Sequence, residues 1–210
     1  MDRPTDFLLL QCRLDEAHVQ RLAAAATAFC AQSPIPVHLR RLAWSADARA
    51  VYLYARLDTP TPLGAGALAP LAEVFRRSLP EARDVRVSRL EQVFVRDGHS
   101  RAETPVFHYV VEMDPDAGWM PEIARWYDTE HMPGLAAVPG CIHAMRLLNH
   151  DHGPLSLACY DLVSTETLGS PPWLAVRGTA WSDITRPHFT NTKRTMFEVV
   201  PTTPALTEMP

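Results

Sequence analysis

The sequence predicts an α+β fold in which two βαββαβ repeats pack sheet to sheet within one chain of 210 residues. Segments typical of strands and helices occur in the order β-α-β-β-α-β twice, and corresponding segments lie roughly 100 residues apart. Strands such as residues 106–113 (VFHYVVEM) are apolar on both alternating faces, as in a sheet that is covered on both sides. We therefore expect helices on one face of each sheet and the other repeat on the opposite face.

The first repeat is expected in residues 1–99. Asp15 is the candidate N-cap of its first helix, which should continue to about residue 31, before Pro34 and Pro36. A second helix is expected over residues 69–79. The predicted strands are residues 6–13, 37–44, 50–57 and 84–95.

The second repeat is expected in residues 105–201, after a linker at 100–105 and before a tail at 202–210. Its helices are predicted over residues 119–131 and, more weakly, 172–184. Its predicted strands are residues 106–113, 140–149, 155–163 and 194–200. Residue identity between the halves is poor, so the repeat is inferred from the order of the elements.

Composition argues against several classes of partner. The net charge is -4 and no basic run occurs, which argues against nucleic-acid binding. The apolar run near the N-terminus is interrupted by Gln11 and Arg13 and is too short for a signal peptide or a membrane span. Four widely spaced cysteines without a CxxC pair favour reduced thiols and a cytoplasmic protein.

Residues 124–141 (ARWYDTEHMPGLAAVPGC) combine a helical apolar face with side chains that can transfer protons. Proline and glycine at positions 133 and 134 are expected to end this helix. Asp128 and His131 are three residues apart and could hydrogen-bond on one face. A helix C-terminus favours a cation and would raise the pKa of His131. The alternative is a solvated helix end without a catalytic role.

This segment resembles the dimeric α+β barrel superfamily, which has ferredoxin-like repeats, and especially its EthD-like and uncharacterised relatives. The resemblance covers residues 105–200 and implies a pocket between each sheet and its helices. Members include cofactor-free monooxygenases, lactone isomerases, decarboxylases and haem enzymes, so the fold is a weak guide to the reaction. The matching residues are Trp126, Tyr127, Glu130, His131, Pro133, Val138, Pro139, Gly140 and Arg146.

Candidate catalytic residues are grouped around His131, which we expect to act as acid or base with Asp128 or Glu130 as its orienting partner. Tyr127 could donate a hydrogen bond to a carbonyl or enolate. The corresponding stretch of the first repeat, AAAATAFCAQ, has no ionisable group, so the second repeat is expected to carry the site.

Candidate substrate-binding residues are Trp126, Arg146, Tyr109 and His188. Arg146 could bind a carboxylate, or could pair with Glu112 or Glu198. Consecutive strand residues point to opposite faces, so only one of His108 and Tyr109 can face the pocket. Each of these residues also has a purely structural interpretation.

The predicted function is cofactor-independent acid/base chemistry on a small hydrophobic molecule that carries a carbonyl or phenol, by an isomerase, decarboxylase or monooxygenase-like enzyme. His150, Asp151 and His152 lack a further ligand at metal-binding spacing, so no metal site is predicted. Alternatives are a non-catalytic ligand-binding or assembly protein, and a haem-binding barrel with His131 or His188 as axial ligand. A homodimer of the chain is left open.

Overall fold

The computed structural model describes residues 4–202, and the chain divides into two compact units. The first comprises Met1–Ser88 with Val199–Pro210, and the second comprises Arg89–Glu198. The division falls inside a strand, on the N-terminal side of the predicted linker at 100–105. The predicted repeat bounds, 1–99 and 105–201, therefore stay predictions about element order, and the predicted tail after residue 202 lies outside the described residues.

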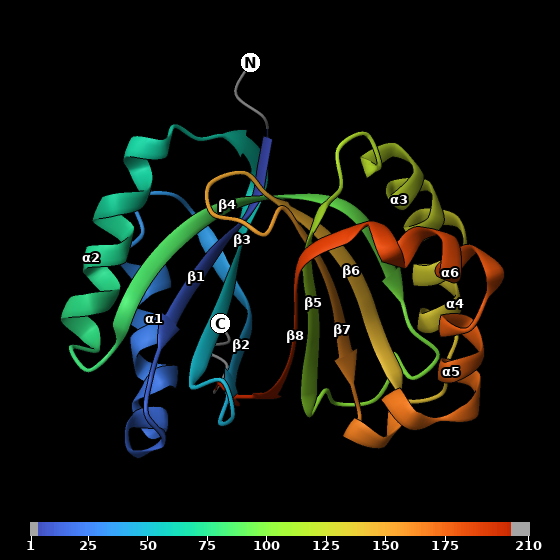
Figure 1. Cartoon of the computed structure of the whole chain (residues 1–210). Coiled ribbons are helices and arrows are strands. Elements are labelled where there is room, and N and C mark those ends of the chain that lie inside the picture. The colour runs from blue at the N-terminus through green and yellow to red at the C-terminus, as the bar shows by residue number, and fades with distance from the viewer. Residues whose placement is uncertain (1–3, 203–210) are drawn as a thin grey trace, which may run out of the picture. The chain divides into compact units, whose positions relative to one another are not determined.

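The first unit combines an antiparallel sheet with two helices. Strand β3 (Ala50–Pro62) lies between β1 (Pro4–Arg13) and β2 (Val37–Ser45). Helices α1 (Leu22–Ala31) and α2 (Leu68–Ser78) lie side by side (Figure 1), and Phe29 and Phe75 meet edge to face between them. The order β-α-β-β-α is as predicted.

Asp15 occupies the predicted N-cap position, but its side chain makes no capping hydrogen bond. The first turn, Glu16–Arg21, is 3-10 rather than α-helical. The Asp15 carboxylate instead accepts a hydrogen bond from Arg83 at 2.8 Å. Residue 15 therefore links the start of the helix to the start of β4 (Arg83–Asp97).

The second unit has a five-stranded antiparallel sheet in the order β8-β5-β7-β6-β4. Its helical segments lie together on one side of this sheet (Figure 1). All predicted strands are present, and β8 begins five residues earlier than expected. The strands are β5 (Phe107–Pro115), β6 (Cys141–Asn149), β7 (Ser156–Leu162) and β8 (Phe189–Val199), with the end of β4.

Five helical segments of this unit follow one another around Tyr127–His131 and the last strand. The region predicted as one weak helix over 172–184 is two short helices followed by a 3-10 turn. The segments are α3 (Met120–Trp126), a π-helical turn (Tyr127–His131), α4 (Met132–Ala136), α5 (Pro171–Arg177) and α6 (Ala180–Thr185). A 3-10 turn, Arg186–His188, leads from α6 into β8.

The prediction that Pro133 and Gly134 end the helix is wrong, because both lie inside α4. The Met132 amide donates to the Tyr127 carbonyl five residues back, so the π-helical turn joins α3 to α4. Pro133 lies in the first turn of α4, where a missing N–H is tolerated. A Cβ at Gly134 would meet the Val176 side chain at 2.9 Å, so this glycine permits close packing against α5.

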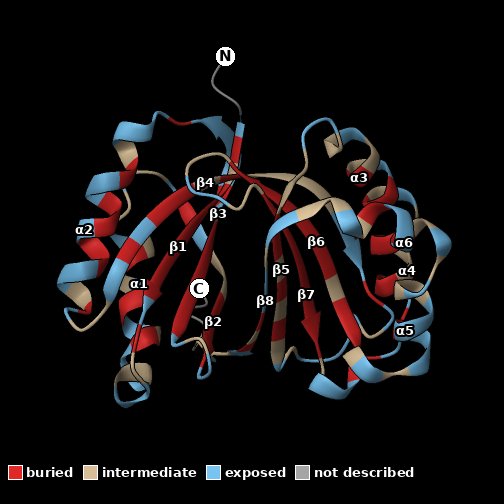
Figure 2. Ribbon diagram, viewed as in Figure 1, coloured by how far each residue is buried: buried red, intermediate tan, exposed pale blue. Residues whose placement is uncertain are grey.

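Burial follows the expected pattern in the second unit, where β7 is buried throughout and β5 alternates between buried and partly buried residues (Figure 2). All four cysteines are free thiols, and Cys12, Cys141 and Cys159 are buried as predicted. Burial raises the pKa of the Cys12 and Cys141 thiols to about 12. No helix within residues 4–202 is long and apolar enough to cross a membrane.

Candidate functional site

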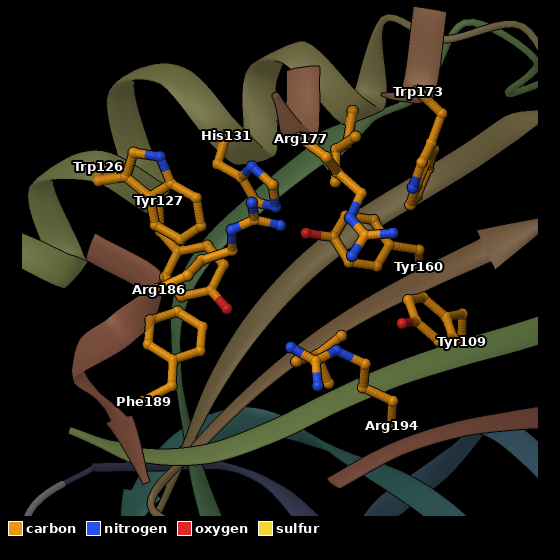
Figure 3. Close-up of a pocket in the computed structure, with 12 residues that line it drawn as sticks. Tyr109, Trp126, Tyr127, His131, Tyr160, Trp173, Arg177, Arg186, Phe189 and Arg194 are labelled. Atoms are coloured by element: carbon orange, nitrogen blue, oxygen red, sulfur yellow. The ribbon is translucent and has the colours of Figure 1, made fainter. Parts of the chain in front are cut away.

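A hollow lies between the sheet and the helical segments of the second unit (Figure 3). The cavity itself has a volume of about 30 Å³, room for about one water molecule, within about 380 Å³ of space that includes its opening to solvent. Aromatic and cationic side chains dominate its lining, and none of the lining residues is acidic. They are Tyr109, Val111, Trp126, Tyr127, His131, Leu135, Tyr160, Trp173, Arg177, Arg186, Phe189 and Arg194.

His131 is positioned by the π-helical turn and packs against an aromatic wall. Its ring stacks on Trp126 with centroids 4.1 Å apart and planes inclined by 24°, and it meets Tyr127 edge-on at 5.6 Å. No hydrogen bond joins its ring to another described residue, and Nδ1 is fully buried. His131 is therefore held by stacking rather than by a polar partner.

The His131 pKa is lowered to about 3, first by burial and then by the nearby charges of Arg186 and Arg177. The expected rise in this pKa is wrong. The helix continues through α4, so the carbonyls that would favour a cation are not at residue 131. The imidazole is neutral at neutral pH and can accept a proton.

Neither predicted orienting partner is bonded to His131. Asp128 accepts a hydrogen bond at 2.8 Å from Arg146, and Glu130 accepts one at 2.6 Å from the Thr179 hydroxyl. These bonds fix the two ends of the acidic stretch to β6 and to the N-cap of α6. Asp128 and Glu130 thus hold the turn in place and are absent from the lining of the hollow.

Arg146 lies behind the wall of the hollow instead of lining it. Its side chain is only 2% exposed, and its guanidinium carbon is 5.5 Å from the centre of the Tyr127 ring. The predicted alternatives, Glu112 and Glu198, are not its partners: Glu112 faces Lys193 at 3.6 Å. Arg146 therefore supports Tyr127 and anchors Asp128.

Tyr127 and Trp126 form the wall beside His131. Tyr127 stacks on Phe189 with centroids 6.0 Å apart and planes inclined by 22°. Burial raises the pKa of the Tyr127 phenol, and the charges of Arg146 and Arg194 only partly oppose this rise. Tyr127 is therefore a neutral hydroxyl that can donate to a bound oxygen.

Strand β5 directs Tyr109 into the hollow and His108 to the opposite face of the sheet. Tyr109 lies opposite Tyr160 of β7, and their rings stack with centroids 6.3 Å apart. His108 instead has its Nδ1 2.8 Å from Asp161. The sequence left open which of the two residues faces the hollow, and in the structure it is Tyr109.

His188 does not reach the hollow. Its Nδ1 lies 3.1 Å from the Asp116 carboxylate, and its ring stacks on Trp119. The predicted site residues that line the hollow are therefore His131, Tyr127, Trp126 and Tyr109.

Sequence reasoning missed Arg177, Arg194 and Tyr160, whereas Arg186 belongs to Thr185–Thr192, a polar segment that could close over a ligand. Arg177, Arg186 and Arg194 come from α5, the 3-10 turn and β8, and Tyr160 and Trp173 complete the aromatic walls. These residues form no motif, although Arg186 lies in the polar segment TRPHFTNT that directly precedes and opens the last strand. The predicted apolar pocket is therefore a cationic one with aromatic walls.

Neither a metal nor a haem fits the described side chains. Within residues 4–202 no group of three His, Cys, Asp or Glu side chains could hold an ion. Asp151 is bound by Arg89, and His150 lies 3.0 Å from Glu91. A haem macrocycle is too large for the hollow that His131 faces, and His188 lies outside it.

No family model matches the sequence, and no curated protein matches it. Solved structures do match the fold. A candidate monooxygenase from Fusobacterium nucleatum subsp. nucleatum has a TM-score of 0.66 at 9% identity, with 96% of this chain and 94% of that chain covered. An anthrone oxidase-like protein has a TM-score of 0.63 at 13% identity, covering 95% and 92%.

A variant of the chlorite dismutase from Candidatus Nitrospira defluvii also matches, with a TM-score of 0.60 at 8% identity, covering 94% and 92%. Matches of this kind establish the fold and leave the reaction open. The chain has a ferredoxin-like α+β fold.

Proposed function

We propose that the second unit is a small-molecule enzyme of the monooxygenase type, acting on a phenolic or enolisable carbonyl substrate. The observation that carries this proposal is a neutral imidazole, free of protein hydrogen bonds, in a hollow lined by aromatic rings and guanidinium groups. The likeness to a candidate monooxygenase and to an anthrone oxidase-like protein supports the same reaction class. The tandem arrangement and the EthD-like relationship predicted from the sequence are part of this proposal.

His131 is the proposed base. In the empty hollow the pKa of His131 is low, because burial and two guanidinium groups oppose a further positive charge on its ring. When a bound substrate loses its proton, the resulting anion offsets those guanidinium charges and pairs with the new imidazolium. Proton transfer and charge compensation then occur together, and the basicity of His131 rises when it is needed.

The anion formed in this step is an enolate or phenolate, which Arg186, Arg177 and the hydroxyl of Tyr127 would stabilise. Such an electron-rich carbon can react with dioxygen without a bound cofactor. For a substrate with a CH2 group beside an aromatic ring, CH2 and O2 give a carbonyl and one molecule of water. Asp128, Glu130 and Arg146 act as positioning residues, because they hold the turn and Tyr127 from outside the hollow.

The test is oxygen uptake by the purified full chain with anthrone and with hydroxynaphthalenes. We expect the H131Q variant to lose at least about a hundredfold in kcat, as removal of a general base does. H99Q is the matched control, because His99 is exposed and lies outside the hollow. A folded H131Q variant with full turnover would remove the imidazole from the mechanism.

A second candidate is a non-catalytic protein that binds aromatic anions. The low pKa of His131 favours it, because an imidazole with a pKa of about 3 is a weak base unless an anion is present. In that case the wild type would bind these phenols without oxygen uptake, and H131Q would bind them equally well.

A further inference from the structure

We propose that the substrate carries a permanent carboxylate, bound beside Arg194 in the hollow. The proposal depends on the proposed function only for the identity of the reacting group. Three guanidinium groups from three separate elements, Arg177, Arg186 and Arg194, face one hollow whose lining contains no acid (Figure 3).

Within the described part of the chain these arginines lack close counter-charges, as do the exposed Arg96 and Arg101, and what sets them apart is the hollow that they share. Arg89, Arg125 and Arg146 each have a carboxylate within 2.7–2.8 Å. Among residues 4–202, Arg177 and Arg194 form no ion pair, and the contact of Arg186 with the largely exposed Asp183 is 3.5 Å long. Arg177 and Arg186 are partly buried and Arg194 is exposed, so water screens the charge of Arg194 in part. An anion from outside the protein would relieve the remaining repulsion.

The three charges act on different side chains of the lining. Arg186 acts on His131, the proposed base. Arg194 pairs with Val111 on the neighbouring strand and acts on Tyr109 and also on Tyr127. Arg177 acts on both His131 and Tyr109. A transient enolate at His131 supplies one negative charge for three guanidinium groups, so a second, permanent anion on the substrate would offset charge that the enolate leaves.

A carboxylate fits beside Arg194, Arg177 and Tyr109. Guanidinium groups bind carboxylates through paired N–H donors, and Tyr109 keeps its phenolic proton because burial raises its pKa. The walls beside them are the rings of Trp126, Tyr160 and Trp173, which have to move apart to admit an aromatic ring because the cavity itself is about 30 Å³. The chemical class that matches is an aromatic carboxylate that also carries a phenolic or enolisable group.

The experiment compares 2-naphthoate with its neutral, equally sized amide, 2-naphthamide, by titration calorimetry on the full chain. We expect the carboxylate to bind at least about tenfold more tightly than the amide. R194Q should reduce this preference to less than about threefold, and an unchanged circular dichroism spectrum and melting temperature report an intact fold. R194K should restore part of the preference for the carboxylate. R101Q should keep all of this preference, because Arg101 is exposed and lies outside the hollow.

Equal affinity for the two probes, an undiminished preference in R194Q, or no binding of 2-naphthoate would each overturn the proposal. Failure of the proposed function gives a different result, in which the wild type prefers 2-naphthoate but turns over no phenolic substrate. Oxygen uptake with neutral substrates, without any preference for carboxylates, would instead retain the function and reject this inference.

Discussion

The indole of Trp126 and the imidazole of His131 stack with ring centroids 4.1 Å apart, and both rings line the hollow. The residues are five apart in sequence, and the π-helical turn that begins after Trp126 brings them onto the same face. The stack covers one side of the imidazole and excludes water from it. This explains why burial is the largest cause of the low His131 pKa.

That pKa makes the stability of the protein depend on pH. The free energy of unfolding should fall as pH drops from 6.5 towards 3, because the unfolded chain binds a proton that native His131 does not. At pH 5 the contribution of this residue should be about 2 kcal/mol less than at neutral pH. Urea denaturation of wild type and H131Q at pH 7.5 and pH 5 measures the difference. Parallel losses in the two proteins would contradict it.

R186Q should raise the pKa of His131, because Arg186 opposes protonation of the imidazole more strongly than Arg177 does. The value should stay below 6.5, since burial is the main cause and is unchanged. NMR titration of the imidazole ring protons gives this pKa directly, with R101Q as the charge-matched control. An unchanged value in R186Q would show that this guanidinium does not act on the imidazole.

Removal of the Asp128 side chain should reduce the free energy of unfolding more than removal of the Arg146 side chain. Arg146 is 2% exposed and Asp128 is 38% exposed, so loss of Asp128 leaves a buried cation without its partner. We expect D128A to reduce the free energy of unfolding by about 3 kcal/mol. R146M should cost less, because water can reach the remaining carboxylate.

The double variant D128A/R146M should be more stable than D128A alone, since it removes the unpaired cation. Chemical denaturation of the three proteins measures the order. A D128A variant as stable as wild type would mean that the ion pair contributes nothing to the fold.

Alanine variants of two glycines with positive φ angles distinguish the cost of backbone strain from the cost of steric overlap. Gly118 has a φ of 82° and open space around it, whereas a Cβ at Gly140, with a φ of 95°, would overlap the Thr167 hydroxyl. G118A should cost about 1–2 kcal/mol from its left-handed backbone. G140A should cost at least about 1 kcal/mol more, from the overlap. Thermal or urea unfolding of both variants tests the order, and equal losses would contradict it.

Strand alternation and helical spacing were sufficient to predict the framework. The strands of the second unit and the segment that carries Trp126, Tyr127 and His131 follow from periodicity, and β5 alternation predicts that one of His108 and Tyr109 faces the hollow. Burial of Cys141 and Cys159 follows from their apolar surroundings. Local pattern is informative where one face of an element must be covered.

The polar contacts could not be predicted because they join distant segments. Asp128 is paired with Arg146 from another element, so its spacing from His131 was misleading. The cationic lining comes from Arg177, Arg186 and Arg194, which no motif connects. Pro133 suggested a helix end because sequence alone does not reveal that a proline can lie in the first turn of a following helix.

The π-helical turn contains one residue more than an ideal α-helical path would need. Deleting a single position within Tyr127–His131 would let the segment close as an ordinary α-helix with α3 and α4 in place, while the side chains inside the turn would change direction. Two chains could thus share every residue type of this motif and still present different side chains to a ligand. In an alignment, a one-position gap here would mark a change of specificity more reliably than any substitution beside it.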